Sequence, residues 1–418
     1  MSKTKVVISC PIDTYSGYGA RSRDIVKALV NLDKYDVKVL SQRWGNTSTG
    51  FLRDHGMDDL DALITPKVEE QPDVWIQITV PNEFQPYGKY NIGITAGIET
   101  TICDPSWVQG CNRMNLILTS SNHSKEVFEK SIFEQADRNN NVVGSLKLTT
   151  PMEVLFEGVD LTKYFKTKST FNLDQIQESF AFLFVGTWLK GDFGHDRKNV
   201  GYLIKSFLET FKNKKNQPAL ILKTSLGTSS HIHTDVMLQR ISAIISSVKG
   251  KLPNIYLIDG DLSDEEVNQL YNHSKVKAMI SLTKGEGFGR PLLEFSTISK
   301  PIMCSAWSGQ ADFLDKEFSF LVGGTLEKVH KSAAEKGVIL EEASWFKPDD
   351  NSVHQGYKSI FENYKKYSEL SKRQAYRSKT VFSFEKMQEE LDRLFSNYIP
   401  EFPKQVELTL PKLEVPKL

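Results

Sequence analysis

The sequence is poor in cysteine and has no long apolar run. Its four cysteines include no Cys-x-x-Cys pair and have no histidine neighbour at a zinc-ligand spacing. This excludes a disulfide framework and predicts four buried thiols in a reducing compartment. No stretch reaches the roughly 18 consecutive apolar residues of a membrane-spanning helix, and the first apolar run, at 6–8, is too short for a secretion signal. We therefore expect a soluble, cytoplasmic protein, with peripheral contact to a membrane left open.

The chain also lacks an excess of charge of either sign, since 52 Lys and Arg residues balance 52 Asp and Glu residues. The balance is uneven along the chain. Residues 1–160 carry 16 basic and 21 acidic residues, whereas residues 161–418 carry 36 and 31. The second part is thus the better place for an anionic ligand. Neither part is basic enough to predict tight, non-specific binding of nucleic acid.

Short apolar runs alternate with helical patterns along most of the 418 residues, a length at which chains normally divide into two domains. Strands are expected at 5–10, 37–40, 74–80, 91–96, 116–119, 154–156, 180–186, 219–223, 255–258, 278–282 and 301–304. Helices are expected at 124–131, 236–248, 264–272, from Pro291, and at 357–367 and 384–395, and one after the first strand would bury Ile25, Val26, Leu29 and Val30. This alternation predicts two doubly wound, Rossmann-like α/β domains that face each other across a cleft.

The pattern becomes polar and irregular between about residues 160 and 179, which places a domain boundary near residue 165. We expect an N-terminal domain at 1–165, a second domain at 166–383, a helix at 384–399 and a tail at 400–418. Four prolines interrupt the tail and exclude a regular helix. We expect the tail to lie on the body, to join a partner subunit in an oligomer, or to fray.

The segment 284–294, Lys-Gly-Glu-Gly-Phe-Gly-Arg-Pro-Leu-Leu-Glu, lies between an expected strand and an expected helix. Its three glycines permit backbone dihedrals that side chains forbid, and they leave room for a ligand against the main chain. Pro291 suits the first turn of a helix, whose free N–H groups favour phosphate. Glu294 would lie on that first turn, where its carboxylate can accept two hydroxyl hydrogen bonds, as a ribose offers.

This segment resembles the E-x7-E arrangement of retaining GT-B glycosyltransferases, with Glu286 and Glu294 as its two glutamates, and it is most similar to glycosyltransferase family 4. Other segments resemble that family in the same order: SSNHSK at 120–125, EGVD at 157–160, VG at 185–186 before RKN at 197–199, GDLS at 260–263 and WFKPD at 345–349. So many ordered matches, over residues 5–395, are improbable by chance. The resemblance implies the GT-B fold, with an acceptor-side first domain, a donor-binding second domain and a C-terminal helix that crosses back to the first.

The resemblance also implies roles for single residues. Glu294 would bind the nucleotide ribose, Glu286 would face the donor sugar, and Lys198 would neutralise the diphosphate. The expected donor-binding residues are Gly186, Thr187, Lys223, Leu262, Gly287, Phe288, Gly289, Pro291, Leu292 and Glu294.

Two family features are missing from the sequence. Thr187 stands where an arginine usually follows the domain-opening glycine, so Arg197 or Lys223 would supply that charge. The usual acceptor-domain histidine is not evident. The segment TAGIET at 95–100 resembles a subgroup with a glutamate there, so Glu99 would contact the donor sugar or the acceptor, or serve as a structural carboxylate. His123 is interpreted as structural. The expected catalytic residues are Glu286, Arg197, Lys198 and Glu99.

These roles imply retaining transfer of a sugar from a UDP- or GDP-sugar to a hydroxyl acceptor, preferably a carbohydrate. The leaving phosphate would take the acceptor proton, so we expect no dedicated general base, no metal ion and no other cofactor. A lipid, a protein and a modified DNA base stay open as acceptors. A non-catalytic nucleotide-sugar-binding protein is the alternative of another class, and a nucleotide-sugar hydrolase or epimerase is a third possibility.

The glycine loop after the first expected strand contains Gly17, Tyr18 and Gly19. It is interpreted as an acceptor-side or phosphate loop, or as a simple tight turn. Tyr18 and two other aromatic residues of the first domain, Tyr15 and Trp44, are candidates for stacking on sugar rings.

Two further patterns suggest metal sites only weakly. Asp259 and Asp261 match the Asp-x-Asp motif of the GT-A fold, but two α/β halves disfavour that fold. His231 and His233 have no third ligand nearby and are expected in a polar surface loop.

Overall fold

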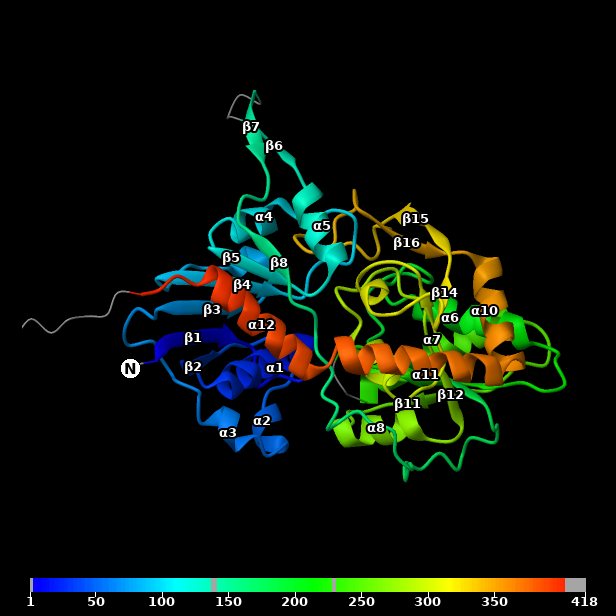
Figure 1. Ribbon diagram of the computed structural model, residues 1–418. Helices are drawn as coiled ribbons and strands as arrows, with labels where there is room; N and C mark the ends of the chain where they lie inside the picture. The colour runs from blue at the N-terminus through cyan, green and yellow to red at the C-terminus, as the bar shows by residue number, and fades with distance from the viewer. Residues whose placement is uncertain (1–2, 137–140, 228–230, 403–418) are drawn as a thin grey trace, which may run out of the picture.

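The computed structural model describes residues 3–136, 141–227 and 231–402. The tail predicted at 400–418 lies outside the described residues from residue 403 onward. Two open six-stranded sheets form the centres of two α/β domains (Figure 1). The predicted pair of Rossmann-like domains is confirmed.

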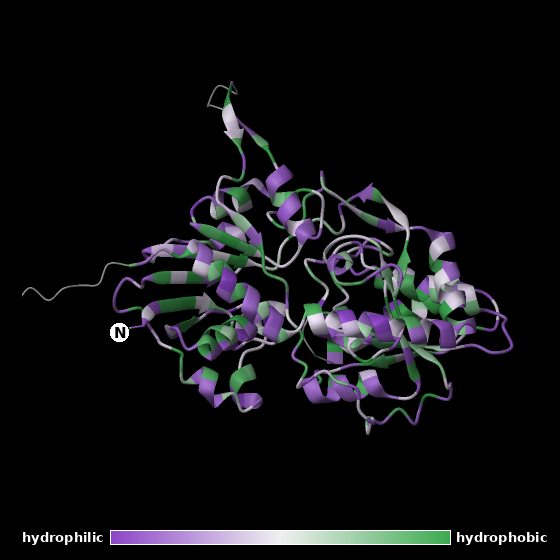
Figure 2. Ribbon diagram, in the orientation of Figure 1, coloured by the Kyte–Doolittle hydropathy of each residue, from purple (hydrophilic) through white to green (hydrophobic). Residues whose placement is uncertain are grey.

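The first sheet is parallel throughout and belongs to the N-terminal domain. Its central strands are buried on both faces because helices cover both sides, which explains their continuous apolar runs (Figure 2). The strand order is β2 (Tyr35–Ser41), β1 (Thr4–Cys10), β3 (Val74–Ile78), β4 (Tyr90–Thr95), β5 (Leu116–Thr119), β8 (Met152–Val154).

The second sheet is also parallel and repeats this arrangement. Its order is β11 (Ile255–Ile258), β10 (Ala219–Lys223), β9 (Ala181–Val185), β12 (Val276–Ser281), β13 (Ile302–Ser305), β14 (Phe320–Val322). Two antiparallel pairs complete the strands: a hairpin of β6 (Phe133–Ala136) and β7 (Val142–Leu146), which projects from the first domain (Figure 1), and β15 (Gly324–Lys328) with β16 (Ser344–Pro348).

The helices flank the two sheets. Those of the first domain are α1 (Gly17–Leu32), α2 (Phe51–Asp54), α3 (Asp58–Asp61), η1 (Pro81–Glu83), α4 (Pro105–Cys111) and α5 (Asn122–Lys130). Those that follow are α6 (Val200–Phe211), α7 (His231–Ser247), α8 (Asp264–Asn272), α9 (Arg290–Ser296), η2 (Gly309–Asp312), α10 (Asp350–Glu362), α11 (Tyr364–Val381) and α12 (Phe384–Tyr398).

Helix α12 leaves the second domain and packs on the first (Figure 1), as the GT-B resemblance implies. Its apolar residues recur at intervals of three or four and enter the core beside β1 and α1. At the crossing, Val159 donates its N–H to the Phe382 carbonyl (2.9 Å) and accepts from Phe384 N–H (2.9 Å). The buried residues of α12 are Phe384, Met387, Leu391, Leu394 and Phe395.

Most predicted elements match the observed ones within a few residues, but the last part of the second domain was predicted wrongly. The single helix expected at 357–367 is two helices, α10 and α11, which meet at Asn363. Asn363 has φ −115° and ψ 36°, outside helical geometry, and this interrupts the helix. Local periodicity does not detect the break, because apolar residues continue across it.

Smaller errors concern side chains on helices. Val30 is 43% exposed, because it lies about a quarter turn from the stripe formed by Ile25, Val26 and Leu29. His231 and His233 open helix α7 rather than lying in a loop. Glu294 is the fifth residue of α9 and thus belongs to its second turn, not its first.

All four cysteines are free and buried, as predicted. Within the described residues, no helix combines the length and the apolar character needed to cross a membrane.

Candidate active site between the two domains

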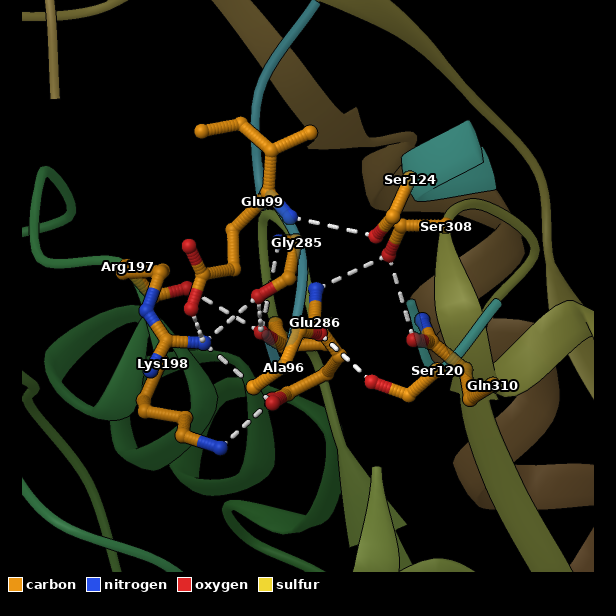
Figure 3. A network of polar contacts seen from close by, with 12 residues as sticks. Ala96, Glu99, Ser120, Ser124, Arg197, Lys198, Gly285, Glu286, Ser308 and Gln310 are labelled. Carbon is orange, nitrogen blue, oxygen red and sulfur yellow. Dashed lines mark hydrogen bonds and ion pairs between the residues drawn. The ribbon is translucent and has the colours of Figure 1, made fainter. Parts of the chain in front are cut away.

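The glycine segment follows β12 at its carboxyl end and meets the carboxyl end of β4 from the other domain (Figure 3). In open α/β sheets, ligands bind at these strand ends. A Cβ built on Gly285 would lie 1.9 Å from the Glu99 carbonyl oxygen, and one on Gly287 would lie 2.1 Å from that of Ala96. The backbones of the two domains therefore come into close contact here.

The three glycines were predicted to permit unusual backbone dihedrals and to leave room for a ligand, and the structure shows a different purpose for two of them. Only Gly289 has a positive φ, of 103°, so only there is a left-handed conformation required. Gly285 and Gly287 instead make room for the backbone of the first domain, which sequence alone cannot reveal.

The Glu286 carboxylate lies at the centre of a buried ion-pair cluster (Figure 3). Lys198 Nζ lies 2.6 Å from Glu286 Oε1, and Arg197 Nη1 lies 3.2 Å from Oε2. Both cations come from the segment just before α6, and Lys284 N–H donates to the Arg197 carbonyl (2.8 Å), which joins that segment to the glycine segment. Three of the four predicted catalytic residues thus meet.

Arg197 also reaches the fourth predicted catalytic residue. Its Nη1 lies 3.5 Å from Glu99 Oε1 and donates to the Gly285 carbonyl at 2.8 Å. Glu99 belongs to the first domain and Arg197 to the second, so this guanidinium bridges the interface. The structure therefore brings Glu99, Arg197, Lys198 and Glu286 into one cluster.

The cluster shifts the ionisation of its members. Burial opposes ionisation of Glu286, but Lys198 and Arg197 outweigh it and hold the pKa of that carboxyl below its usual value. Burial lowers the pKa of Lys198, although Glu286 acts against this. Burial would also lower the pKa of Arg197, but Glu99 and Glu286 raise it. The cluster thus places two cations against two carboxylates, with no net formal charge, in a largely dry site where each charge interacts strongly with its neighbours.

Glu294 lies in a second buried cluster. Arg290 Nε donates to its Oε1 at 2.9 Å, and both residues belong to α9. Burial raises the pKa of Glu294 to about 7, with Arg290 opposing and Asp264 adding to the shift. The two glutamates of the motif therefore lie in differently charged surroundings, because two cations lower the pKa of Glu286 whereas burial raises the pKa of Glu294 to about 7.

The other predicted donor-binding residues differ in what they present to the site. Phe288 and Leu292 pack in the core of the second domain, so only their backbone is available to a ligand. Lys223 does not join the ion cluster, and its Nζ donates to the Gly260 carbonyl at 2.5 Å. The remaining ones lie after β9 (Gly186, Thr187), in the loop before α8 (Leu262), in the glycine segment (Gly287, Gly289) and on α9 (Pro291).

Gly17, Tyr18 and Gly19 do not form the predicted loop but open helix α1 after its N-cap Ser16, and this helix start is tied to the same strand end. Tyr18 Oη lies 3.0 Å from Thr95 Oγ1 and accepts from Ala96 N–H at 3.1 Å, and burial raises its pKa to about 12. Trp44 stacks on its ring at 4.0 Å. A Cβ on Gly19 would lie 2.3 Å from the Thr14 carbonyl oxygen, whereas Gly17 faces open space. A side chain at position 19 would thus clash with the turn that precedes α1.

Sequence reasoning missed a set of hydroxyl and amide groups around the cluster (Figure 3). Ser308 Oγ accepts from Glu286 N–H at 2.9 Å and contacts Gln310 Oε1 at 3.2 Å. Ser120 Oγ donates to the Ala96 carbonyl at 2.7 Å. Ser308 follows the end of β13, a position at which the predicted topology could have identified it.

The patterns considered for metal binding gather no ligand set. Across residues 3–136, 141–227 and 231–402, no group of three or more His, Cys, Asp or Glu side chains has the arrangement to hold a metal ion. His123 is largely buried against Trp307 at 4.5 Å, and burial lowers its pKa to about 4, so it is neutral at pH 7.

No protein-family model matches the sequence, and no curated protein matches it either. Solved structures do match the fold. HepE from Anabaena, in complex with UDP and glucose, shares 12% identity at a TM-score of 0.60 over 94% of this chain and 100% of that one. A glycosyltransferase from Rickettsia africae shares 12% identity at a TM-score of 0.61, over 96% of this chain and 99% of that one. Sucrose-phosphate synthase from Thermosynechococcus elongatus shares 11% identity at a TM-score of 0.61, over 95% of this chain and 99% of that one.

The chain has the GT-B fold. The match covers nearly the full length of each of these chains, both domains included. In this GT-B structure the four-residue cluster lies where the two domains meet, at the carboxyl ends of both sheets.

Proposed function

We propose that this protein is a glycosyltransferase that moves a sugar from a nucleoside-diphosphate sugar to a hydroxyl acceptor with retention of configuration. The observation that carries the proposal is the contact of Lys198 and Arg197 with Glu286 at the domain interface. Two cations beside a strand end are what a leaving diphosphate requires. The retaining mechanism and the relation to glycosyltransferase family 4 rest on the sequence resemblance.

The chemistry needs stabilisation of opposite charges at two ends of one breaking bond. As the sugar–phosphate bond lengthens, the sugar becomes cationic and the diphosphate gains negative charge. Lys198 and Arg197 would then exchange part of their contact with Glu286 for the phosphate oxygens, in surroundings that are already dry and ordered. Glu286, and Glu99 across the interface, would face the cationic sugar.

For retention, we propose front-face transfer. The acceptor oxygen attacks the anomeric carbon on the side that the leaving phosphate vacates, and that phosphate takes the acceptor proton. This requires no dedicated general base and no resident metal ion or cofactor.

Glu294 is the proposed ribose ligand, and a uridine or guanosine diphosphate is the proposed leaving group. UDP-glucose is the first donor to test, because HepE has been solved with UDP-glucose and the trehalose-6-phosphate enzyme of E. coli with UDP-2-fluoro glucose. A carbohydrate is the proposed acceptor. The stacked Tyr18 and Trp44 rings, joined to Ala96 at the interface, supply an aromatic surface for sugar rings. The excess of 21 acidic over 16 basic residues in residues 1–160 disfavours a nucleic acid.

The test is a screen of UDP- and GDP-sugars for binding, followed by product analysis with the best donor and a set of oligosaccharide acceptors. We expect a transferred sugar in the α configuration from an α-linked donor. An inverted linkage would refute retention. Free sugar or an epimer as the sole product would favour a hydrolase or epimerase, and binding without turnover would favour a non-catalytic nucleotide-sugar-binding protein.

A further inference from the structure

Arg290 joins the proposed ribose ligand to the opposite domain through one partly buried guanidinium. Its Nε donates to Glu294 Oε1 at 2.9 Å, and its Nη1 donates to Asp24 Oδ2 and lies 3.7 Å from Glu157 Oε2. Asp24 belongs to α1 of the first domain, 266 positions away in sequence. The side chains are 22% (Arg290), 14% (Asp24) and 9% (Glu294) exposed, so water screens these pairs only weakly.

The first-domain side of this contact is held firmly. Arg21, one turn before Asp24 on α1, donates to the Phe156 and Leu155 carbonyls, which come just before Glu157. This fixes α1 against the segment that leads out of the first domain. Asp24 and Glu157 therefore present two carboxylates to Arg290 from a rigid support.

Without Arg290, the second domain would leave Glu294 with no close positive charge among the described residues. Asp264 opens α8 nearby and is already paired with Lys163 at 2.6 Å. Burial raises the pKa of Glu294, and Arg290 is the main group that opposes this shift. Among the described residues, Arg290 supplies the hydrogen bond that Glu294 receives, and Oε2 accepts none.

We propose that Arg290 is a positioning residue that orients Glu294 toward the ribose hydroxyls, and that Asp24 holds Arg290 in place from the opposite domain. Oε1 of Glu294 then accepts a hydrogen bond from Arg290, while Oε2 stays available to accept hydrogen bonds from the ribose hydroxyls. Neither Arg290 nor Asp24 contacts the reacting atoms. This inference rests on the proposed function, because it takes Glu294 as the ribose ligand.

The test compares the affinities of wild type, Arg290→Gln, Asp24→Asn and Glu294→Ala for three probes: UDP, 2′,3′-dideoxyuridine diphosphate and inorganic pyrophosphate. We expect Arg290→Gln and Asp24→Asn each to weaken UDP binding about tenfold, as loss of a charged hydrogen bond does. Both should leave the affinity for the dideoxy nucleotide and pyrophosphate unchanged. In turnover, KM for the donor should rise about tenfold while kcat changes less than about twofold.

Asp33→Asn is the matched control, because Asp33 caps the same helix and pairs with Lys3 at an exposed site. It should bind all three probes like wild type. Asp24→Asn keeps the shape of the side chain, so it tests the proposal even if Arg290→Gln folds poorly. Thermal unfolding of each variant shows whether that variant folds.

Two different failures are distinguishable. If Glu294→Ala loses UDP affinity but both positioning variants bind UDP like wild type, the role of Arg290 is refuted and the ribose assignment stands. Equal weakening of UDP and dideoxy nucleotide in the positioning variants also refutes it, since the effect would then not pass through the hydroxyls. If Glu294→Ala binds UDP as tightly as wild type does, or if neither protein binds UDP, the ribose assignment itself is wrong and the inference falls with it.

Discussion

The backbone of Gly285 abuts the carbonyl oxygen of Glu99, so that a Cβ at position 285 would lie only 1.9 Å from that oxygen. The two residues belong to different domains, and Arg197 contacts both Glu99 and Glu286 beside this contact. The packing of the glycine segment on the first domain thus sets the distance across which the charged side chains meet.

Gly285→Ala should therefore separate the domains locally and impair activity. We expect a loss of about 100-fold in kcat/KM, because misplacement of reacting groups by about 1 Å has effects of that size. The free energy of unfolding should fall by about 1–3 kcal/mol, since the added Cβ must displace backbone of the first domain. Initial rates and urea unfolding measure the two quantities.

Gly323→Ala is the control for that variant, because its Cβ would meet only Ser352 Oγ, at 4.0 Å. It should retain wild-type rates. Full activity of Gly285→Ala would contradict a requirement for the close domain contact.

Lys198→Ala should lower kcat by about 100-fold or more, because the leaving diphosphate loses one of its two cations. Thermal unfolding should shift little, since Arg197 still pairs with Glu286 at 3.2 Å. Lys215→Ala, which removes an exposed lysine of the same domain, serves as the control. A wild-type rate for Lys198→Ala would remove this residue from the site.

The affinity for UDP should increase as pH rises from 6 to 8. The pKa of Glu294 is raised to about 7 by burial, so its carboxyl is mostly protonated at pH 6 and mostly ionised at pH 8. The ionised form is the one that accepts two hydroxyl hydrogen bonds. We expect about a tenfold gain in affinity over this range beyond that of Glu294→Gln, measured by calorimetric titration. Parallel pH profiles for wild type and Glu294→Gln would contradict this role.

Leu391→Ala should destabilise the protein by about 2–5 kcal/mol, because Leu391 is fully buried where α12 packs on the first domain. Chemical denaturation measures this change. Glu389→Ala on the same helix should change stability by about 0.5 kcal/mol at most, since its ion pair with Lys386 is exposed. Equal stability of the two variants would contradict the buried crossing of α12.

Activity should persist in the presence of a strong chelator. The proposed leaving-group stabilisation uses Lys198 and Arg197, not a metal ion. Initial rates with EDTA, with and without added magnesium or manganese, measure this. A strict requirement for a divalent ion would contradict the proposed metal-independent mechanism.

Much of the fold could be predicted because its signals are local. The strands at 116–119, 219–223 and 255–258 were predicted with their observed bounds, since each is a short apolar run between turn residues. The break at Asn363 and the exposure of Val30 were missed, because periodicity does not report a single interrupted turn or the edge of an apolar stripe.

For the site, the sequence alone determined which residue types were available and where on the chain they stood: the glycine segment, its two glutamates and the Arg197–Lys198 pair. Tertiary structure alone decided which charges meet. Arg197 pairs with Glu99 across the interface, Lys223 turns to Gly260 instead, and Arg290 joins Glu294 to Asp24. The physical reason is that composition and periodicity report burial and backbone conformation, whereas an ion pair between domains depends on how two separately folded sheets are oriented.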